Sequence, residues 1–319
     1  MTPLTRRAFV GAAAGCGGYL LAALAGATSA TRRLFAAEPA ALPVRAEPWG
    51  RLERVANGVW MLISTPLAGT ETSGAMRTFS NGGIVAGREA VLAIEGFASV
   101  EGAQWLAGEA RRLTGRWPTH AVLTHCHGDH SAGLGGYRAD GAPVKLLGTA
   151  VTRELLEQRR PGAVIPETVL PPDRETELDL GGRRVRIVPR EGHTPSDLTI
   201  EVVDPRVVFC GDLVWIGLFP NFVDATPSRQ TAHVRALLAQ PATLWVPGHG
   251  SAARAAELRD FLALLESIED GARRAVARGM PAAEAARGWR PPVSLGEWVR
   301  FSDDYYEVAF RAWERELRS

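Results

Sequence analysis

The sequence predicts an α+β fold in one large domain, with strands and helices alternating through both halves of the chain. Short apolar runs bounded by glycine and proline indicate strands, and longer stretches rich in helix-forming residues between them indicate helices. The chain has 319 residues, of which 46% are apolar and 22% are charged, which is enough to bury a layered core. We therefore expect sheets covered by helices.

The elements follow one another in a regular order. The first half is expected to contain strands at 55–64, 82–86, 90–95, 119–124 and 144–147, and helices at 100–113 and 149–158. After a proline-rich loop at 160–173, the second half is expected to contain strands near 184–189, 198–203, 206–210 and 243–247, and a helix near 228–239. Helix-favouring composition predicts further helices at 252–279 and about 295–317.

The last predicted helix carries large aromatic side chains at spacings of three to five residues. They are Trp298, Phe301, Tyr305, Phe310 and Trp313. We expect this stripe to pack on the domain, and a pocket wall or a homodimer surface is the alternative.

The N-terminal residues resemble an export signal. Arg6 and Arg7 precede a weakly apolar, Gly/Ala-rich stretch at 8–27, as in twin-arginine signals, and small residues then offer cleavage sites. We expect a signal peptide at 1–36, recognition by the twin-arginine export machinery and a periplasmic product, with an uncleaved membrane anchor as the alternative. Residues 37–50 are predicted to be a linker, and 51–319 the folded domain, with C-terminal helices at 252–319.

Net charge argues against nucleic acid as a partner. The whole chain carries a formal charge of +1, and removing Arg6 and Arg7 with a signal would make it negative. A nucleic-acid binder normally shows a basic patch or stripe, so a small-molecule substrate is expected instead.

Residues 125–130 hold three histidines and an aspartate directly after an apolar run. Histidine is the commonest protein metal ligand, and a carboxylate adds charge and an oxygen donor. In extended backbone alternate residues share a face, so His125 and His127 can converge on one ion. Asp129 and His130, where the chain turns, can point at a second ion nearby.

Three further ligands are expected at the ends of other strands. His193, Asp212 and His249 each follow an apolar run and have glycine or proline beside them, which lets the backbone bend sharply toward an ion. Because these residues must meet the 125–130 segment in space, the domain cannot be divided between them.

The order H-x-H-x-D-H, then His, Asp and His, resembles the metallo-β-lactamase-fold hydrolase superfamily, especially its glyoxalase II-like branch, over about residues 52–255. The local sequences at 80–83, 93–97, 192–197 and 218–221 also resemble exported members associated with sulfur oxidation and quinoprotein systems. The resemblance implies a four-layer αββα sandwich with a metal site at one edge of its two sheets. It further implies that a first metal is held by His125, His127 and His193, a second by Asp129, His130 and His249, and that Asp212 bridges them.

Two close zinc ions would make water a nucleophile near neutral pH, so the expected reaction is hydrolysis of an activated acyl bond in a lactam, lactone or thioester. Asp129 is the expected catalytic residue, which would orient the nucleophile and pass a proton to the leaving group. The expected substrate-binding residues follow Asp212 in the chain and are Trp215, Phe219, Asn221 and Phe222.

Two other functions remain open. The superfamily includes persulfide dioxygenases, and His127, His193 and Asp212 could hold one Fe²⁺ in such a facial triad. The second alternative is a non-catalytic periplasmic metal-binding protein.

Several residues close to these motifs have other expected roles. Cys126 is expected to be a small buried residue, and Cys210 to be buried near Asp212 with a ligand role as the alternative. His120 and His233 are expected to be structural. Glu95 stands where the resemblance leads us to expect Asp, which affects how the metal-ligand loop is supported.

Overall fold

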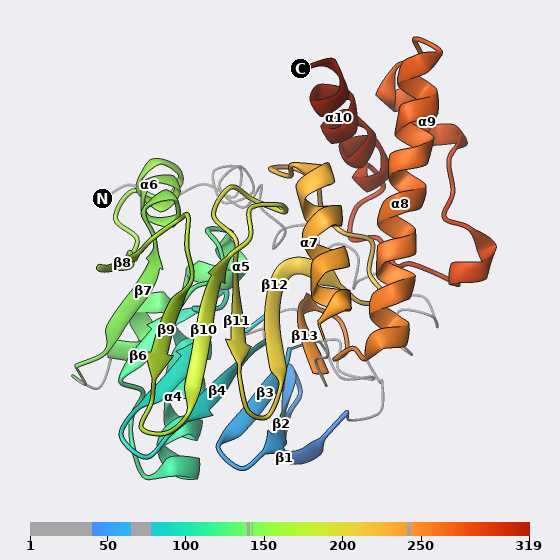
Figure 1. Cartoon of the computed structure of the whole chain (residues 1–319). Helices are drawn as coiled ribbons and strands as arrows, with labels where there is room; N and C mark the ends of the chain where they lie inside the picture. Colours follow the sequence, from blue (N-terminus) through green and yellow to red (C-terminus); the bar gives the residue numbers. More distant parts are fainter. Residues whose placement is uncertain (1–39, 65–77, 139–140, 142, 241–243) are drawn as a thin grey trace.

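The computed structural model describes residues 40–64, 78–138, 141, 143–240 and 244–319, and its strands form two sheets (Figure 1). The first sheet has eight strands in the order β1 to β8, and the second has five in the order β13-β12-β11-β10-β9. The first contains β1 (Leu42–Glu47), β2 (Gly50–Ala56), β3 (Val59–Ile63), β4 (Gly82–Ala86), β5 (Val91–Ile94), β6 (His120–Val122), β7 (Lys145–Thr149) and β8 (Thr168–Leu170). The second contains β9 (Thr176–Asp179), β10 (Arg184–Pro189), β11 (Leu198–Val202), β12 (Val207–Trp215) and β13 (Leu244–His249).

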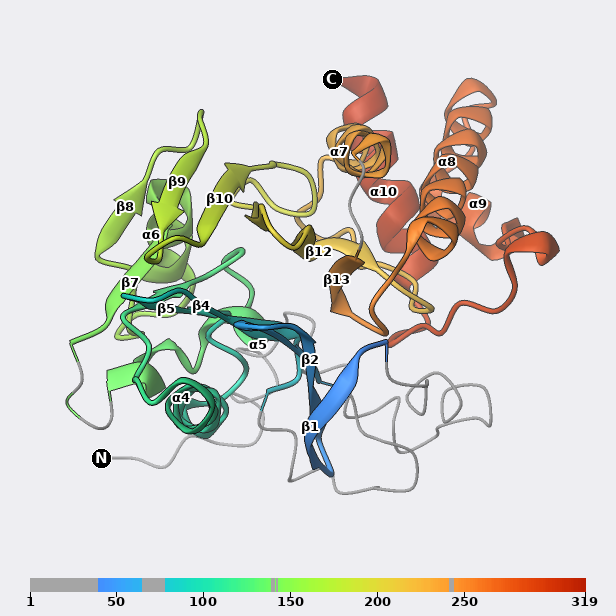
Figure 2. The same ribbon diagram turned by 60° about the horizontal axis from the view of Figure 1, so that its bottom comes forward.

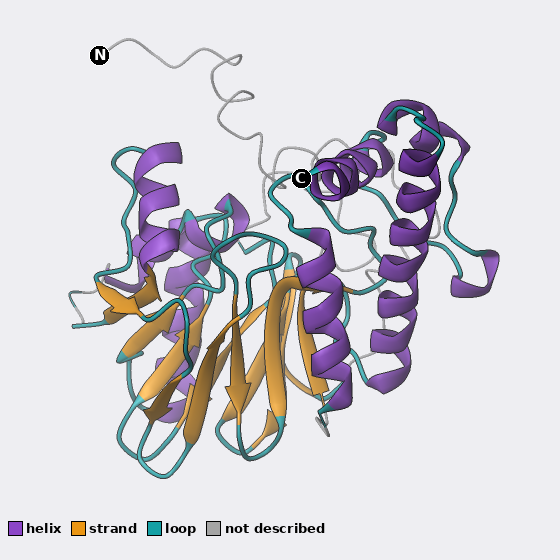
Figure 3. Cartoon of the chain, turned by 45° about the horizontal axis from the view of Figure 1, so that its top comes forward, coloured by secondary structure: helices purple, strands orange, loops and turns teal. Residues whose placement is uncertain are grey.

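Helices flank the sheets on both sides (Figure 3). They are α4 (Val100–Thr114), α5 (Gly128–Ser131), α6 (Ala150–Arg159), α7 (Pro227–Ala239), α8 (Ala255–Ala277), α9 (Ala282–Gly288) and α10 (Tyr305–Arg318), with 3-10 turns η1 (Leu134–Arg138) and η2 (Val293–Leu295). Helix α4 begins at a side-chain cap, because Ser99 Oγ accepts a hydrogen bond from the Gly102 amide, and it ends at Gly115 in the left-handed conformation.

Three apolar clusters hold the layers together. Met61 of β3 and Phe209 of β12 belong to the cluster between the sheets, while Trp60 of β3 packs with Leu106 of α4 on the other face of the first sheet. On the outer face of the second sheet, Trp245 packs in a cluster with side chains of α7, α8 and α10. Figure 2 shows α4 and these C-terminal helices on opposite sides of the two sheets. The predicted four-layer αββα sandwich is confirmed.

Strand direction places the predicted ligands at one edge of this sandwich. Strands β5, β6 and β7 are parallel, as are β12 and β13. The 125–130 segment follows β6, and His249 is the last residue of β13. Because the carboxyl ends of parallel strands lie at the same edge of a sheet, these residues are brought to a common position.

The structure corrects three predictions in the first part of the chain. The predicted linker at 37–50 is wrong for residues 42–47, which form β1 and pair with β2. The single strand predicted at 55–64 is a hairpin, since the chain turns at Asn57 and Gly58, where Gly58 has φ +75°. The predicted loop at 160–173 contains the short strand β8, and β9 follows where no element was expected.

The C-terminal part also differs from its prediction. The last helix begins at Tyr305 rather than near residue 295, and α9 was not expected. Trp298 and Phe301 therefore precede the helix, yet all five aromatic residues of the stripe are buried in the cluster beside the second sheet. The prediction that they pack on the domain is confirmed.

The predicted signal peptide at 1–36 lies outside the described residues, as does the stretch considered as a membrane anchor. Within the described residues, none of the helices combines the length and the apolar character needed to cross a membrane.

Candidate metal centre

Four of the predicted ligands form a first group: His125, His127, His193 and Asp212, all buried. His127 Nδ1 lies 3.0 Å from His193 Nε2, and His193 Nε2 lies 3.4 Å from Asp212 Oδ2. His125 Nε2 lies 3.8 Å from the same oxygen. Ligand atoms placed tetrahedrally at zinc bond lengths are about 3.3 Å apart, so this group matches the size of a zinc site.

The other three predicted ligands, Asp129, His130 and His249, form a second buried group. His249 Nε2 lies 3.1 Å from Asp129 Oδ2 and 3.4 Å from His130 Nε2. His130 Nε2 lies 3.7 Å from the same Asp129 oxygen. The structure therefore brings together all seven residues that the sequence indicated, in the two sets that were expected.

Asp212 lies between the two groups. Its Oδ2 faces His193, and its Oδ1 lies 3.1 Å from His130 Nε2 and 3.4 Å from His249 Nε2. The glycine at position 248 leaves room for the Asp212 carboxylate, because a Cβ atom on residue 248 would lie 1.9 Å from Asp212 Oδ1. One carboxylate can thus offer an oxygen to each of two ions.

The protonation of these groups reflects their closeness. Burial alone would raise the pKa of Asp212, but His130 and His249 hold it well below its usual range. Conversely, burial alone would lower the pKa of His249, but the carboxylates of Asp212 and Asp129 raise it to about 9. Burial lowers the pKa of His193 to about 3. The site therefore contains ionised carboxylates buried in contact with histidines.

Several polar atoms in the site have no hydrogen-bond partner among the described residues. They are His125 Nε2, His193 Nδ1, both carboxylate oxygens of Asp129 and both carboxylate oxygens of Asp212. Leaving buried carboxylate oxygens without a donor costs substantial free energy, whereas a divalent cation would satisfy them. Two carboxylates and five histidines form a donor set that suits zinc.

Glu95 supports both groups from behind. Its Oε1 lies 3.0 Å from His130 Nδ1 and accepts a hydrogen bond of 2.5 Å from Thr124 Oγ1, which itself lies 3.0 Å from His125 Nδ1. Such contacts fix the tautomer and orientation of a ligating histidine. Glu95 thus provides a carboxylate that supports the metal-ligand loop, at the position where Asp was expected.

Asp224 contacts a proposed metal ligand, and the sequence did not reveal this contact. Its Oδ2 accepts a hydrogen bond of 2.9 Å from His127 Nε2, so the Nδ1 atom of that ring faces the first group. Arg159 at the end of α6 forms an ion pair with Asp224, with Nη2 3.1 Å from Oδ1. Burial alone would raise the pKa of Asp224, but hydrogen bonds from His127 and Arg159 hold it below its usual range. Asp224 is isolated in the sequence from any ligand motif, and no local pattern marked it.

The loops that carry His193 and His249 are fixed by other polar side chains. Asp197 accepts hydrogen bonds from the Gly192 and Thr194 amides at 3.1 and 2.8 Å, which closes the loop around His193. Asn81 Nδ2 donates to the Pro247 and Gly250 carbonyls, both at 2.9 Å, on either side of His249. These contacts hold the ligands in place before a metal binds.

The four residues predicted to bind substrate are all buried. The Trp215 ring packs on His249, with ring centroids 4.4 Å apart. Phe219 packs against Phe222 and Tyr306 in the cluster beside the C-terminal helices. Phe219 and Phe222 are at most 1% exposed and contribute to this apolar core cluster, and their predicted role in substrate binding stays a prediction.

Asn221, the fourth of these residues, has a structural contact. Its Oδ1 accepts a hydrogen bond of 3.0 Å from the Val223 amide, which shapes the loop that leads to Asp224. The predicted role of Asn221 as a donor to an oxyanion stays a prediction.

Among the described residues, the cysteines and the other two histidines lie outside both ligand groups. Cys126 is buried, and burial raises the pKa of its thiol to about 11, which agrees with a small apolar role. Cys210 is also buried, and its Sγ donates to the Val208 carbonyl. His120 contacts Thr119, and His233 lies on α7.

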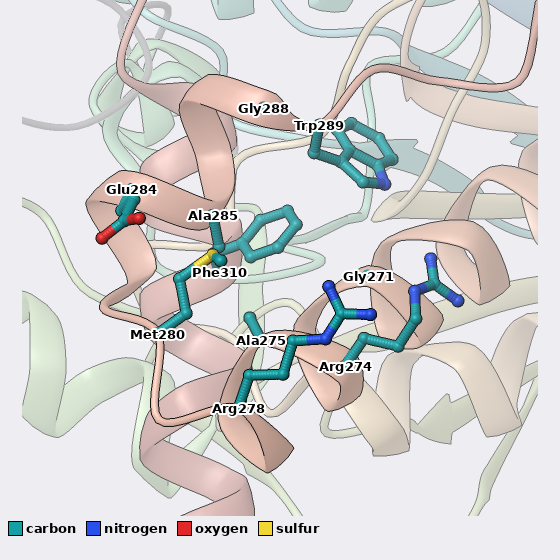
Figure 4. A pocket seen from close by; sticks show the side chains of 10 residues that line it. All are labelled: Gly271, Arg274, Ala275, Arg278, Met280, Glu284, Ala285, Gly288, Trp289 and Phe310. Carbon is teal, nitrogen blue, oxygen red and sulfur yellow. The ribbon is translucent and has the colours of Figure 1, made fainter.

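A separate pocket of about 410 Å³ lies between α8, α9 and α10 (Figure 4). Phe310 and Trp289 contribute aromatic rings to its lining, and Arg274 and Arg278 contribute guanidinium groups. No residue of this pocket belongs to either ligand group.

Comparison with known proteins agrees with this fold and site. Residues 95–267 match the family model of the metallo-beta-lactamase superfamily. Among solved structures, a metallo-beta-lactamase from Pontibacter korlensis has a TM-score of 0.58 at 21% identity, covering 68% of this chain and 99% of that one. One from Erythrobacter litoralis has a TM-score of 0.56 at 19% identity, covering 70% and 98%. The chain belongs to the metallo-beta-lactamase superfamily.

Two curated relatives that share one name match part of this chain in sequence. A hydroxyacylglutathione hydrolase of Glaesserella parasuis serovar 5 (strain SH0165) is 30% identical over 100 residues, which are 31% of this chain and 37% of the relative. A hydroxyacylglutathione hydrolase of Acidiphilium cryptum (strain JF-5) is 30% identical over 140 residues, which are 40% of this chain and 49% of the relative. The chain therefore matches about half the length of these relatives, or less.

Proposed function

We propose that this protein is a zinc-dependent hydrolase that cleaves an activated acyl bond. The observation that carries the proposal is the position of Asp212, whose two carboxylate oxygens face two separate buried ligand groups. When bound, a pair of zinc ions lowers the pKa of water toward neutrality and polarises a carbonyl group, which supplies both a nucleophile and an electrophile.

Asp129 is the proposed catalytic residue. Both of its carboxylate oxygens are buried, and neither has a hydrogen-bond partner among the described residues. Burial alone would raise its pKa, but His130 and His249 lower it, so the carboxylate is ionised and can accept a proton. Its Oδ2 faces His249, and we propose that it orients the attacking nucleophile and then returns a proton to the leaving group.

The thioester is the substrate class that the relatives favour. Both curated relatives are named for hydrolysis of hydroxyacylglutathione, in which the acyl group is bonded to sulfur. Lactams and lactones contain acyl bonds that the same chemistry can open. We therefore propose activated acyl compounds as the substrate class, and thioesters as the first substrates to test. If the predicted signal acts, the hydrolase is an exported protein.

A one-iron dioxygenase built on His127, His193 and Asp212 is less consistent with the geometry. It would leave Asp129, His130 and His249 as a second buried group of ligand type without a role. Two ions would use every member of both groups, including the Asp129 oxygens that lack donors.

Substitution of Asp129 by Asn tests the proposed mechanism. Asp129→Asn should retain metal at the first group, whose ligands are unchanged, and should lower kcat by at least about 100-fold, the usual scale of general acid–base assistance. Asp270→Asn, which alters an exposed acid on α8, is the matched control and should leave kcat unchanged. A nitrocefin-type lactam, a short acyl lactone and a glutathione thioester form the panel of substrates. Full turnover by Asp129→Asn would refute the assigned role.

A further inference from the structure

Arg160 follows α6 and reaches the segment that carries the metal ligands. Its amide donates to the Leu156 carbonyl at 2.8 Å, and its carbonyl accepts from the Ala163 amide at 3.0 Å, so the base of the side chain is fixed. A Cβ atom at Gly128 would lie 1.5 Å from Arg160 Nη2. The guanidinium therefore lies against Gly128, between the ligands His127 and Asp129 in the sequence.

This guanidinium has neither an ion pair nor a hydrogen bond within the part of the chain that the structure describes. Its neighbour Arg159 provides the contrast, because Arg159 is neutralised by Asp224. Burial lowers the pKa of Arg160, which the negative charge of Asp129 opposes, but an arginine remains protonated. Removing a charge partly from water is unfavourable unless the charge is paired, so an anionic ligand would stabilise this partly buried cation.

We propose that Arg160 binds a carboxylate group of the substrate at the metal site. This inference rests on the proposed function and adds to it the residue that determines substrate charge. Asp129 is not a hydrogen-bond partner of this guanidinium: its Oδ2 faces His130 and His249, and neither of its oxygens has a hydrogen-bond partner among the described residues. A guanidinium offers two parallel donors to a carboxylate, which gives both attraction and orientation.

The consequence is a preference among acyl substrates. A thioester or a lactam that bears a carboxylate would be bound at Arg160 while its acyl bond lies at the metal site. A neutral lactone would lack that contact. Charge-assisted hydrogen bonds of this kind correspond to roughly a 10-fold to 100-fold difference in binding.

The test compares two thioesters with the same reacting bond. One is an acylglutathione thioester, and the other is the same compound with its carboxylates esterified. Zinc-loaded wild-type protein should show a kcat/KM at least about 10-fold higher for the first. Arg160→Gln should remove this difference, Arg160→Lys should retain part of it, and Arg278→Gln, which removes an arginine from the distant pocket, should leave it unchanged.

Gly128→Ala provides a second test that keeps the arginine. The added methyl group would occupy the present position of Arg160 Nη2 and displace the flexible end of that side chain. It should therefore reduce the preference for the charged thioester, as Arg160→Gln does. Circular dichroism and metal content identify any variant that has simply misfolded.

A binding measurement separates the inference from the proposed function. Calorimetry with a non-hydrolysable S-alkyl glutathione and its diester should give tighter binding of the charged compound to wild type, by about 10-fold or more, and no such difference for Arg160→Gln. If neither thioester is turned over but this difference is found, the proposed thioester hydrolysis fails and the role of Arg160 stands. If wild type and Arg160→Gln discriminate equally in binding, the role of Arg160 is refuted, whatever the turnover.

Discussion

Oδ1 of Asp212 lies 3.1 Å from Nε2 of His130. The other oxygen of the same carboxylate faces the first ligand group, where His193 Nε2 is 3.4 Å away. Asp212 is therefore shared by two buried sets of ligands, and its substitution should disturb both. This sharing is the geometric basis for proposing two metal ions and not one.

Asp224 is expected to strengthen metal binding through His127. Asp224→Asn should lower the metal affinity of the first group by about 10-fold to 100-fold, the usual effect of removing a carboxylate that orients a histidine ligand. Titration of the apoprotein with zinc in the presence of a competing chelator measures this. Arg159→Gln is the matched control, because it removes the ion pair but retains the hydrogen bond to His127. An equal effect of the two variants would contradict the role assigned to that hydrogen bond.

Phe222 is expected to stabilise the fold and not to bind substrate. It is 1% exposed and packs against Phe219, so Phe222→Ala should lower the free energy of unfolding by about 3–5 kcal/mol. Denaturant titration measures the loss, and KM for a well-hydrolysed substrate measures any effect on binding. A large rise in KM with unchanged stability would restore Phe222 to the substrate pocket.

The metal ligands could be predicted from the sequence because each lies in a local pattern. His125 and His127 alternate in the sequence shortly after an apolar run, and Asp212 and His249 follow apolar runs next to glycine. Glu95 also ends an apolar run beside a glycine, and the resemblance marked its position, but Asp224 and Arg160 carry no such pattern. Their roles depend on contacts between segments distant in sequence, which only the folded chain reveals.

The difference between local pattern and long-range contact also explains why some secondary-structure predictions were wrong. The strand β1 was missed because its composition is that of a linker, whereas its pairing with β2 decides its structure. Asn57 and Gly58 form a hairpin signal within the stretch predicted as one strand, because apolar residues lie on both sides of this turn. Trp298 and Phe301 fit a helical spacing although they precede α10, because burial in the aromatic cluster does not require helical backbone.

Export is a prediction that concerns residues outside the described part of the chain. Replacing both Arg6 and Arg7 by Lys should leave precursor in the cytoplasm, because the paired arginines precede the apolar stretch of a twin-arginine signal. Cell fractionation with immunodetection measures the distribution. Undiminished periplasmic protein from the double variant would show that another route operates.

Metal analysis of the purified protein tests the central claim most directly. Mass spectrometry of wild-type protein under native conditions should find about two zinc ions per chain, and Asp212→Ala should retain clearly fewer, because that carboxylate faces both ligand groups. A single iron per chain, with oxygen consumed when a persulfide is added, would contradict the account and favour the dioxygenase.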